Sequence, residues 1–117
     1  MVKFKFSYDK ENDDLFLFNP KSKSKGSVEI ADLVFDYDSK MNLVGLQIMN
    51  ASIFIKETLG DKISSVKTML NNLKECNVDF KLKNNFIFIK INLLAKEKKM
   101  IPITVPNIRE SSPALRN

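Results

Sequence analysis

The chain has 117 residues, of which 44% are apolar and 28% are charged, and its net charge is +5. It contains no histidine and a single cysteine, Cys76, which excludes a Ser-His or Cys-His nucleophile pair, a histidine-ligated metal site and an internal disulfide. The length predicts one domain over residues 1–106, and residues 107–117 have little to bury and are predicted to form a flexible C-terminal tail.

Four antiparallel strands, arranged as a meander, are predicted in the first half of the chain. Alternating apolar and polar residues predict a half-buried strand over 2–7, and the apolar run Leu15–Phe18 predicts its hairpin partner. The same criteria predict one strand over 28–37, bent near Asp32, and a returning strand over 43–49.

The middle of the chain is predicted to be helical. Ser52 can cap the start of a short helix, because its hydroxyl accepts a bond from a backbone N–H one turn ahead, and Gly60 can end that helix. A longer amphipathic helix is predicted from Asp61 to Cys76. Its apolar residues recur at steps of three and four: Ile63, Val66, Met69, Leu70 and Leu73.

Strands return at the end of the chain, over 78–83, 86–93 and 100–105. The first two are joined at Asn84–Asn85, a pair that suits a tight turn because asparagine tolerates positive φ. Pro102 has no N–H to donate, which places the last strand at a sheet edge. The predicted fold class is therefore α+β, with an antiparallel β-meander, a central helical segment and further antiparallel strands.

Two stretches carry a family resemblance. They are Tyr8–Leu17, read as YDKENDDLFL, and Asp36–Ser52, read as DYDSKMNLVGLQIMNAS. Together they resemble a prokaryotic family of small domains of unknown function, over about residues 1–60. The resemblance implies a small antiparallel sheet followed by a helix and no established reaction, and some relatives look like partners in toxin–antitoxin pairs. Met41 stands where that family usually has glycine, so we expect Asn42 to take the positive φ of this turn.

The acidic residues of these stretches predict turns rather than chemistry. The spacing of Asp9, Glu11 and Asp13 is similar to that of a Ca²⁺ loop, but the glycine and glutamate that such a loop needs are replaced by Asp14 and Pro20. The turn Asp9–Asp14 is therefore read as hairpin chemistry, with metal binding as the alternative. Asp36 and Asp38 are read as turn caps, because no base, nucleophile or oxyanion device accompanies them.

The single cysteine and the scarcity of motifs also argue against catalysis. Cys76 lies on the apolar side of the predicted helix and is expected to be a buried structural thiol. We expect no catalytic residue, no cofactor and no metal, and hence no enzyme.

The basic charge belongs to the second half of the chain. Residues 1–61 hold eight basic and ten acidic side chains, whereas residues 62–117 hold eleven and four. Lys81, Lys83 and Lys90 alternate there with Phe86 and Phe88, and these five residues form the predicted interaction surface. Aromatic and basic residues on one sheet can bind nucleic acid, but scattered lysines favour a solvated surface. Nucleic-acid binding is therefore the alternative function.

Several predicted strands are apolar on both faces, and this pattern predicts a partner. Such strands need cover on both sides, and the predicted helices cover about one face. We therefore predict a homodimer, with stacking of two sheets within one chain as the competing explanation. No signal peptide or membrane-spanning segment stands out. The predicted function is a cytoplasmic, self-associating and antitoxin-like module that binds protein.

Overall fold

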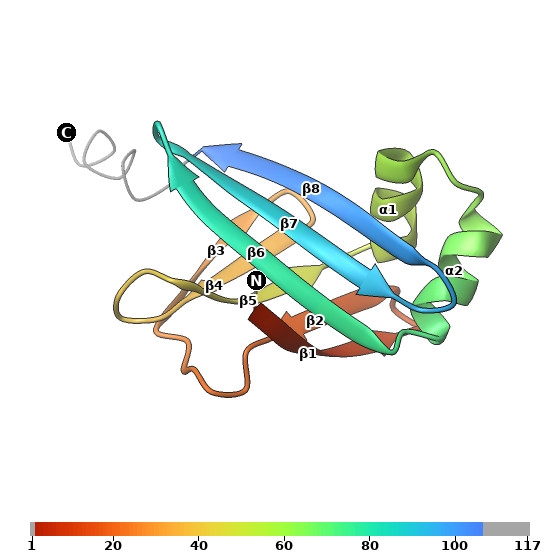
Figure 1. The fold of residues 1–117 in the computed structure, drawn as a ribbon, viewed down its shortest axis with the longest axis horizontal. Helices are drawn as coiled ribbons and strands as arrows, with labels where there is room; N and C mark the ends of the chain where they lie inside the picture. The colour runs from red at the N-terminus through yellow and green to blue at the C-terminus, as the bar shows by residue number, and fades with distance from the viewer. Residues whose placement is uncertain (1, 107–117) are drawn as a thin grey trace.

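The computed structural model describes residues 2–106, and the predicted tail over 107–117 lies outside them. Figure 1 shows a strongly bent sheet with two short helices at one end. The first strands are β1 (Val2–Asp9), β2 (Asp14–Phe18), β3 (Gly26–Ile30), β4 (Leu33–Tyr37) and β5 (Leu43–Ile48). The remaining elements are α1 (Ala51–Leu59), α2 (Ile63–Asn71), β6 (Glu75–Lys83), β7 (Phe86–Leu94) and β8 (Lys98–Pro106).

The fold is mainly β, and the α+β prediction is wrong. Strand accounts for 53% of the structure and helix for 17%. The difference has two local causes. The strand predicted over 28–37 is a hairpin of β3 and β4, which turns at Ala31 with φ 53°. The helix predicted from Asp61 to Cys76 ends at Asn71, and Cys76 lies in β6.

Cys76 was assigned to the wrong element because it fits two periodicities. It continues the helical spacing of Leu70 and Leu73, but it also begins an alternation with Val78 and Phe80 that has the period of a strand. In the structure Cys76 pairs with Phe4 of β1 and is buried. The tertiary pairing therefore decides the local structure against the helical pattern.

The eight strands form one sheet in the order β3-β4-β5-β2-β1-β6-β7-β8, with antiparallel pairing at every step. The predicted meander is wrong, because β5 lies between β4 and β2. Strands β2 to β5 are therefore connected as a Greek key, in which the long connection from β2 reaches β3 at the sheet edge.

Strand β1 joins the two halves of the sheet. Its first residues, Val2 to Phe4, pair with β6, whereas Lys5 to Asp9 pair with β2. The layer formed by β6, β7 and β8 therefore crosses over the layer formed by the other strands (Figure 1). The buried residues of both layers, such as Leu17 and Ile89, belong to one core cluster. Each half of the sheet thus covers the inner face of the other, which is the intrachain stacking that the sequence left as the competing explanation.

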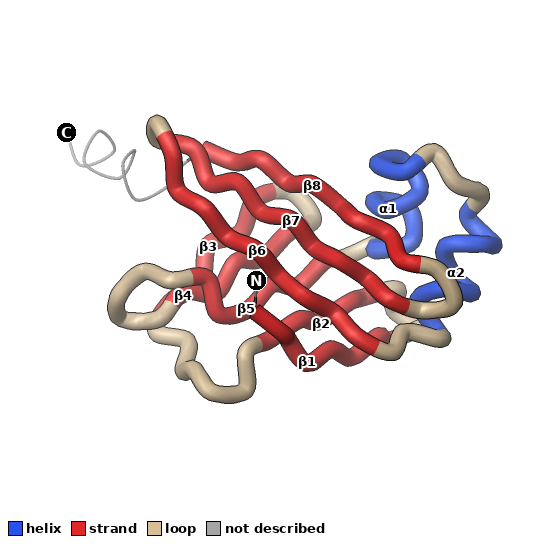
Figure 2. The backbone as a smooth tube through the Cα atoms, in the orientation of Figure 1, coloured by secondary structure: helices blue, strands red, loops and turns tan. Residues whose placement is uncertain are grey.

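The two helices lie together at one end of the layers, as Figure 2 shows. Helix α1 buries Ala51, Ser52 and Ile55, and α2 buries Val66 and Leu70. No helix within residues 2–106 is long and apolar enough to cross a membrane.

Three further predictions concern the turns and the edge of the sheet. Asn84 and Asn85 connect β6 to β7 with φ of 52° and 65°, and β8 with Pro102 is an edge strand, so both predictions are confirmed. The prediction for Asn42 is wrong, because Met41 takes the positive φ, at 67°. Asn42 instead donates its backbone N–H to the Asp38 carboxylate at 2.8 Å.

The inward alternation of β7 predicts the effect of one substitution. Ile89 is 1% exposed, so Ile89→Ala should lower the free energy of unfolding by about 2–5 kcal/mol, because the shortened side chain leaves a cavity. Lys90→Ala, one position along on the opposite side of the strand, should change it by less than about 0.5 kcal/mol. Urea unfolding followed by circular dichroism measures both, and equal costs for the two variants would contradict this assignment of faces.

Candidate functional site

The structure brings all five residues of the predicted interaction surface to one side of the sheet. Lys81 pairs with Phe88, and Lys83 pairs with Phe86, across β6 and β7. Lys90 follows Phe88 by two positions on β7, so it projects on the same side. We call this side of β6, β7 and β8 the outer face, because Ile87, Ile89 and Ile91 point the other way and are buried.

The outer face exposes apolar groups to solvent. Phe86 and Phe88 are 45% and 38% exposed, and their ring centroids lie 6.5 Å apart. On the neighbouring strand β8, Met100 is also exposed, as are Pro102 and Pro106. Isolated exposed apolar residues are ordinary, but a run of them across two strands is typical of a contact surface.

The charges of the outer face are ordered along β6. Glu75 and Asp79 lie toward its start, and Lys81 and Lys83 lie at its end. Glu75 forms an ion pair with Lys3 of β1, with 3.1 Å between Glu75 Oε1 and Lys3 Nζ. These four charged residues of β6 are at the molecular surface. A partner that packs against them would contact negative charge at the start of β6 and positive charge at its end.

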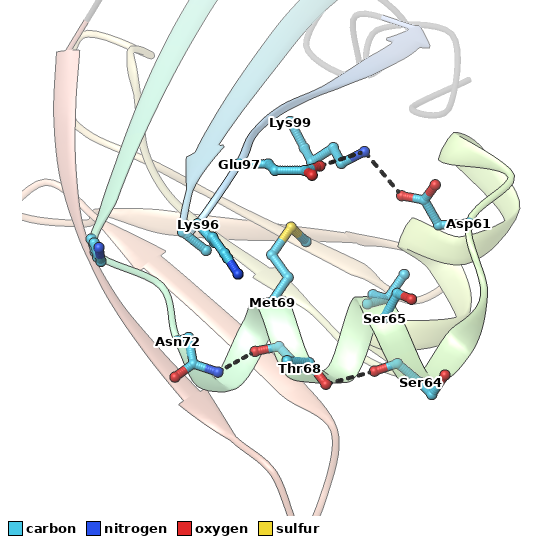
Figure 3. Close-up of a pocket in the computed structure, with 12 residues that line it drawn as sticks. Asp61, Ser64, Ser65, Thr68, Met69, Asn72, Lys96, Glu97 and Lys99 are labelled. Carbon is cyan, nitrogen blue, oxygen red and sulfur yellow. Dashed lines mark hydrogen bonds and ion pairs between the residues drawn. The ribbon is translucent and has the colours of Figure 1, made fainter.

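A cleft of about 790 Å³ lies between α2 and the turn from β7 to β8 (Figure 3). It is lined by Ser64, Ser65 and Met69 of α2 and by Lys96, Glu97 and Lys99 across from them. The backbone N–H of Lys74 donates to the carbonyl of Leu94 at 2.7 Å, and this bond brings the two segments together. No sequence pattern predicts the cleft, because its lining comes from two separate segments and neither carries a motif.

The charges of the cleft are only partly paired. Lys99 lies 3.5 Å from Asp61 and 3.6 Å from Glu97, so one ammonium is shared by two carboxylates (Figure 3). Lys96 and Lys74 also line the cleft, and neither forms an ion pair within residues 2–106. Lys74 and Lys96 therefore contribute two ammonium groups to the cleft, and no carboxylate within residues 2–106 neutralises their charge.

A hydrogen-bonded network centred on Asp13 lies where the predicted helix cap was expected. The Asp13 carboxylate accepts the Ser52 hydroxyl at 2.7 Å and the Ser52 backbone N–H at 3.1 Å. It also accepts the Tyr8 hydroxyl at 2.6 Å. Burial, followed by the hydrogen bond and the charge of Asp13, raises the pKa of Tyr8.

This network corrects the prediction that Ser52 caps α1. Asn50 is the N-cap residue and makes no side-chain cap bond, and Ser52 lies inside the helix, 1% exposed. The cap is supplied by Asp13, which is distant in sequence and has φ 57° in the turn between β1 and β2. With its hydroxyl buried against a carboxylate, Ser52 supports the helix and is not accessible for chemistry.

Asp9 and Asp38 act in turns, as the sequence predicts. Asp9 accepts the backbone N–H groups of Glu11 and Asn12, and the side-chain bond from Asn12 is the main cause of its lowered pKa. Asp38 accepts backbone bonds from Asn42 and Lys40, which lower its pKa in the same way. Residues 2–106 contain no group of three potential metal ligands.

Asp36 and Cys76 are also explained by structure. The prediction that Asp36 caps a turn is wrong, because Asp36 lies within β4 and accepts the Ser27 hydroxyl across the β3–β4 pair. Its carboxylate lies so close to Gly45 that a Cβ there would approach its Oδ2 to 2.7 Å. The Cys76 thiol is buried, and burial, with the Glu75 charge, raises its pKa to about 12. The thiol is therefore protonated at neutral pH. The prediction of a buried cysteine is confirmed, although Cys76 lies in strand β6 and not in a helix.

The Asp13 network predicts a specific loss of stability. Asp13→Asn keeps the side-chain volume and tolerates the positive φ, but it puts an amide in place of a carboxylate that accepts every bond. We expect the free energy of unfolding to fall by about 2–3 kcal/mol, the cost of weakened charge-assisted bonds to partly buried donors. Asp14→Asn is the matched control, since the Asp14 side chain makes no hydrogen bond or ion pair within residues 2–106, and it should cost less than about 0.5 kcal/mol. Thermal or urea unfolding distinguishes them, and equal stability of the two variants would contradict the role of Asp13.

Comparison with known proteins adds a family but no activity. Residues 5–52 match a family described as proteins of unknown function, DUF2283. The chain is 31% identical over 106 residues to an uncharacterised protein of Methanocaldococcus jannaschii, covering 89% of this chain and 85% of that protein. No solved structure matches this chain. The matched residues 5–52 contain both stretches on which the sequence resemblance rests.

Proposed function

Because the chain belongs to the DUF2283 family of proteins of unknown function, we propose its function from its own surface. It is a non-catalytic interaction module that self-associates through the outer face of β6, β7 and β8. The observation that carries this proposal is the exposed pair Phe86 and Phe88 on a strand whose other side is already buried in the core. Their burial against a second copy would remove apolar surface from water.

The face is a better contact than the free edge beside it. Strand β8 is an edge of the sheet, and pairing through backbone hydrogen bonds is one route to a dimer. Pro102 and Pro106 have no N–H group, so this edge lacks donors at two positions. Association through the outer face requires no backbone donor and uses the exposed side chains directly.

The charges of the outer face suit a second copy of the same chain. A two-fold axis that runs across the strands reverses the direction of β6 in the second copy. With the axis centred between Asp79 and Lys81, Asp79 of one copy lies over Lys81 of the other. The same axis places Lys90 of each copy near Phe88 of the other, where the ring face attracts the ammonium.

Self-association predicts a measurable mass and a variant that changes it. At tens of micromolar, light scattering after size exclusion should give twice the 13.4 kDa of one chain. Phe88→Asp should return the mass to one chain, because it places a carboxylate at the centre of the contact. Circular dichroism should show unchanged strand content.

Phe18→Asp is the matched control. Phe18 is 43% exposed and lies on β2, outside the proposed contact, so its substitution should leave the dimer intact. A single-chain mass for the unmodified protein would overturn the proposal. If Phe18→Asp abolished the dimer and Phe88→Asp retained it, the dimer contact would lie on the half of the sheet that contains β2.

A second candidate function is the binding of single-stranded nucleic acid by the same outer face. The placement of Lys81, Lys83 and Lys90 around two exposed phenylalanines favours it, since such rings stack on bases while ammonium groups contact phosphates. Asp79, opposite Lys90, opposes it by placing a carboxylate among the phosphate contacts. The mixed charge of the face therefore favours the dimer.

Nucleic-acid binding is expected to be weak and independent of sequence. Fluorescence polarisation with labelled single-stranded oligonucleotides at physiological salt measures it directly. Any binding should fall steeply with added salt, because lysine contacts release counterions from the backbone. Submicromolar affinity that is lost in Lys81→Glu/Lys83→Glu/Lys90→Glu would reverse the order of the two functions.

A further inference from the structure

We propose that the cleft between α2 and the β7–β8 turn binds a small organic anion with an apolar body, such as an amphiphilic carboxylate. The cleft lies at the helical end of the molecule, its lining includes neither Phe86 nor Phe88, and the two proposals rest on different residues. Its volume of about 790 Å³ is within the range of small-molecule sites.

The cleft is held open by contacts at both ends of α2. Before the helix, Asp61 is held by Lys99 at 3.5 Å. After the helix, the backbone N–H of Lys74 donates to Leu94 at 2.7 Å. Between these points the two segments are separated by the cleft (Figure 3). Helix α2 is therefore fixed relative to the sheet without filling the space beside it.

The charge of the lining selects an anion. Three lysines and two acidic residues line the cleft, and Lys99 lies between both carboxylates. Lys96 and Lys74 are left without a carboxylate partner in the described chain. Figure 3 shows the Lys96 side chain extending from the turn toward α2, so its ammonium is placed to meet a ligand in the cleft.

The remaining lining selects a ligand with an apolar part. Met69 extends into the cleft from α2, as Figure 3 shows, and the lining also includes the largely buried Val66 and Ala95, which are 2% and 5% exposed. The Thr68 hydroxyl and the Asn72 amide are already engaged with backbone carbonyls, at 2.9 and 2.6 Å. A free phosphate would meet Lys96 but leave this apolar surface in water, whereas a carboxylate on an apolar body would satisfy both.

The experiment uses the full chain and the fluorescent probe 8-anilinonaphthalene-1-sulfonate, which joins an anionic group to an apolar body. At neutral pH we expect saturable binding that weakens about tenfold in Lys96→Glu, because the variant replaces an attractive ammonium with a repulsive carboxylate. Lys67→Glu makes the same change of charge on α2 outside the cleft and should leave the affinity unchanged. The probe affinity of Lys96→Gln, which only removes the charge, should lie between those of Lys96→Glu and Lys67→Glu.

Two further measurements locate the probe and define its class. Amide shifts in NMR spectra should change within residues 64–69 and 95–99, and the affinity should be unchanged in Phe88→Asp, which tests the dimer separately. Decanoate should displace the probe, whereas inorganic phosphate at the same concentration should not. The proposal is overturned by absence of binding, by equal affinity in Lys96→Glu and Lys67→Glu, by shifts at Phe86 and Phe88 instead, or by displacement with phosphate alone.

Discussion

The arrangement of this protein depends on the carboxylate of Asp13, which joins the first hairpin to the first helix. Its bonds to Ser52 fix the start of α1 against the turn between β1 and β2. The Asp13 backbone carbonyl also accepts the N–H of Ala51 at 2.8 Å, so the same residue holds two consecutive amides. Helix α1 packs on α2, and α2 forms one wall of the cleft. Asp13 therefore contributes, through α1, to the position of the helix that forms one wall of the cleft.

Strand β1 imposes the second constraint, because it is shared by both halves of the sheet. Its pairing passes from β6 to β2 along its length, so the sheet bends at this strand and closes over its own inner face. This closure explains in part why several strands are apolar on both faces. Their inward residues fill the core, and several outward apolar residues stay exposed: Phe16 and Phe18 on one layer, Phe86 and Phe88 on the other, and Val2, Leu82 and Met100.

Local patterns predicted what local interactions determine. Alternation located most of the strands, and Asn84–Asn85 located a turn, because both depend on neighbouring residues alone. The patterns failed where distant segments decide the outcome: Cys76 follows a helical spacing but pairs with Phe4, and Ser52 has the composition of a cap but is itself capped by Asp13. The five residues of the outer face were found because strand alternation places them together. The cleft was not, because residues 61–74 and 95–99 meet only in the folded chain.

The different lengths of β1 and β6 leave part of β6 with a neighbour on one side. Within residues 2–106, β1 reaches β6 only as far as Val78, while β6 continues to Lys83 in its hairpin with β7. The end of β6 is thus a further open edge of the sheet, in addition to β3 and β8, and it carries the exposed Leu82. Lys81 and Lys83 flank Leu82, and charged residues on an exposed strand discourage backbone pairing with a strand of another chain. Lys81 and Lys83 thus place two positive charges at this edge, and acetylation of both would remove those charges and leave an apolar, uncharged strand end.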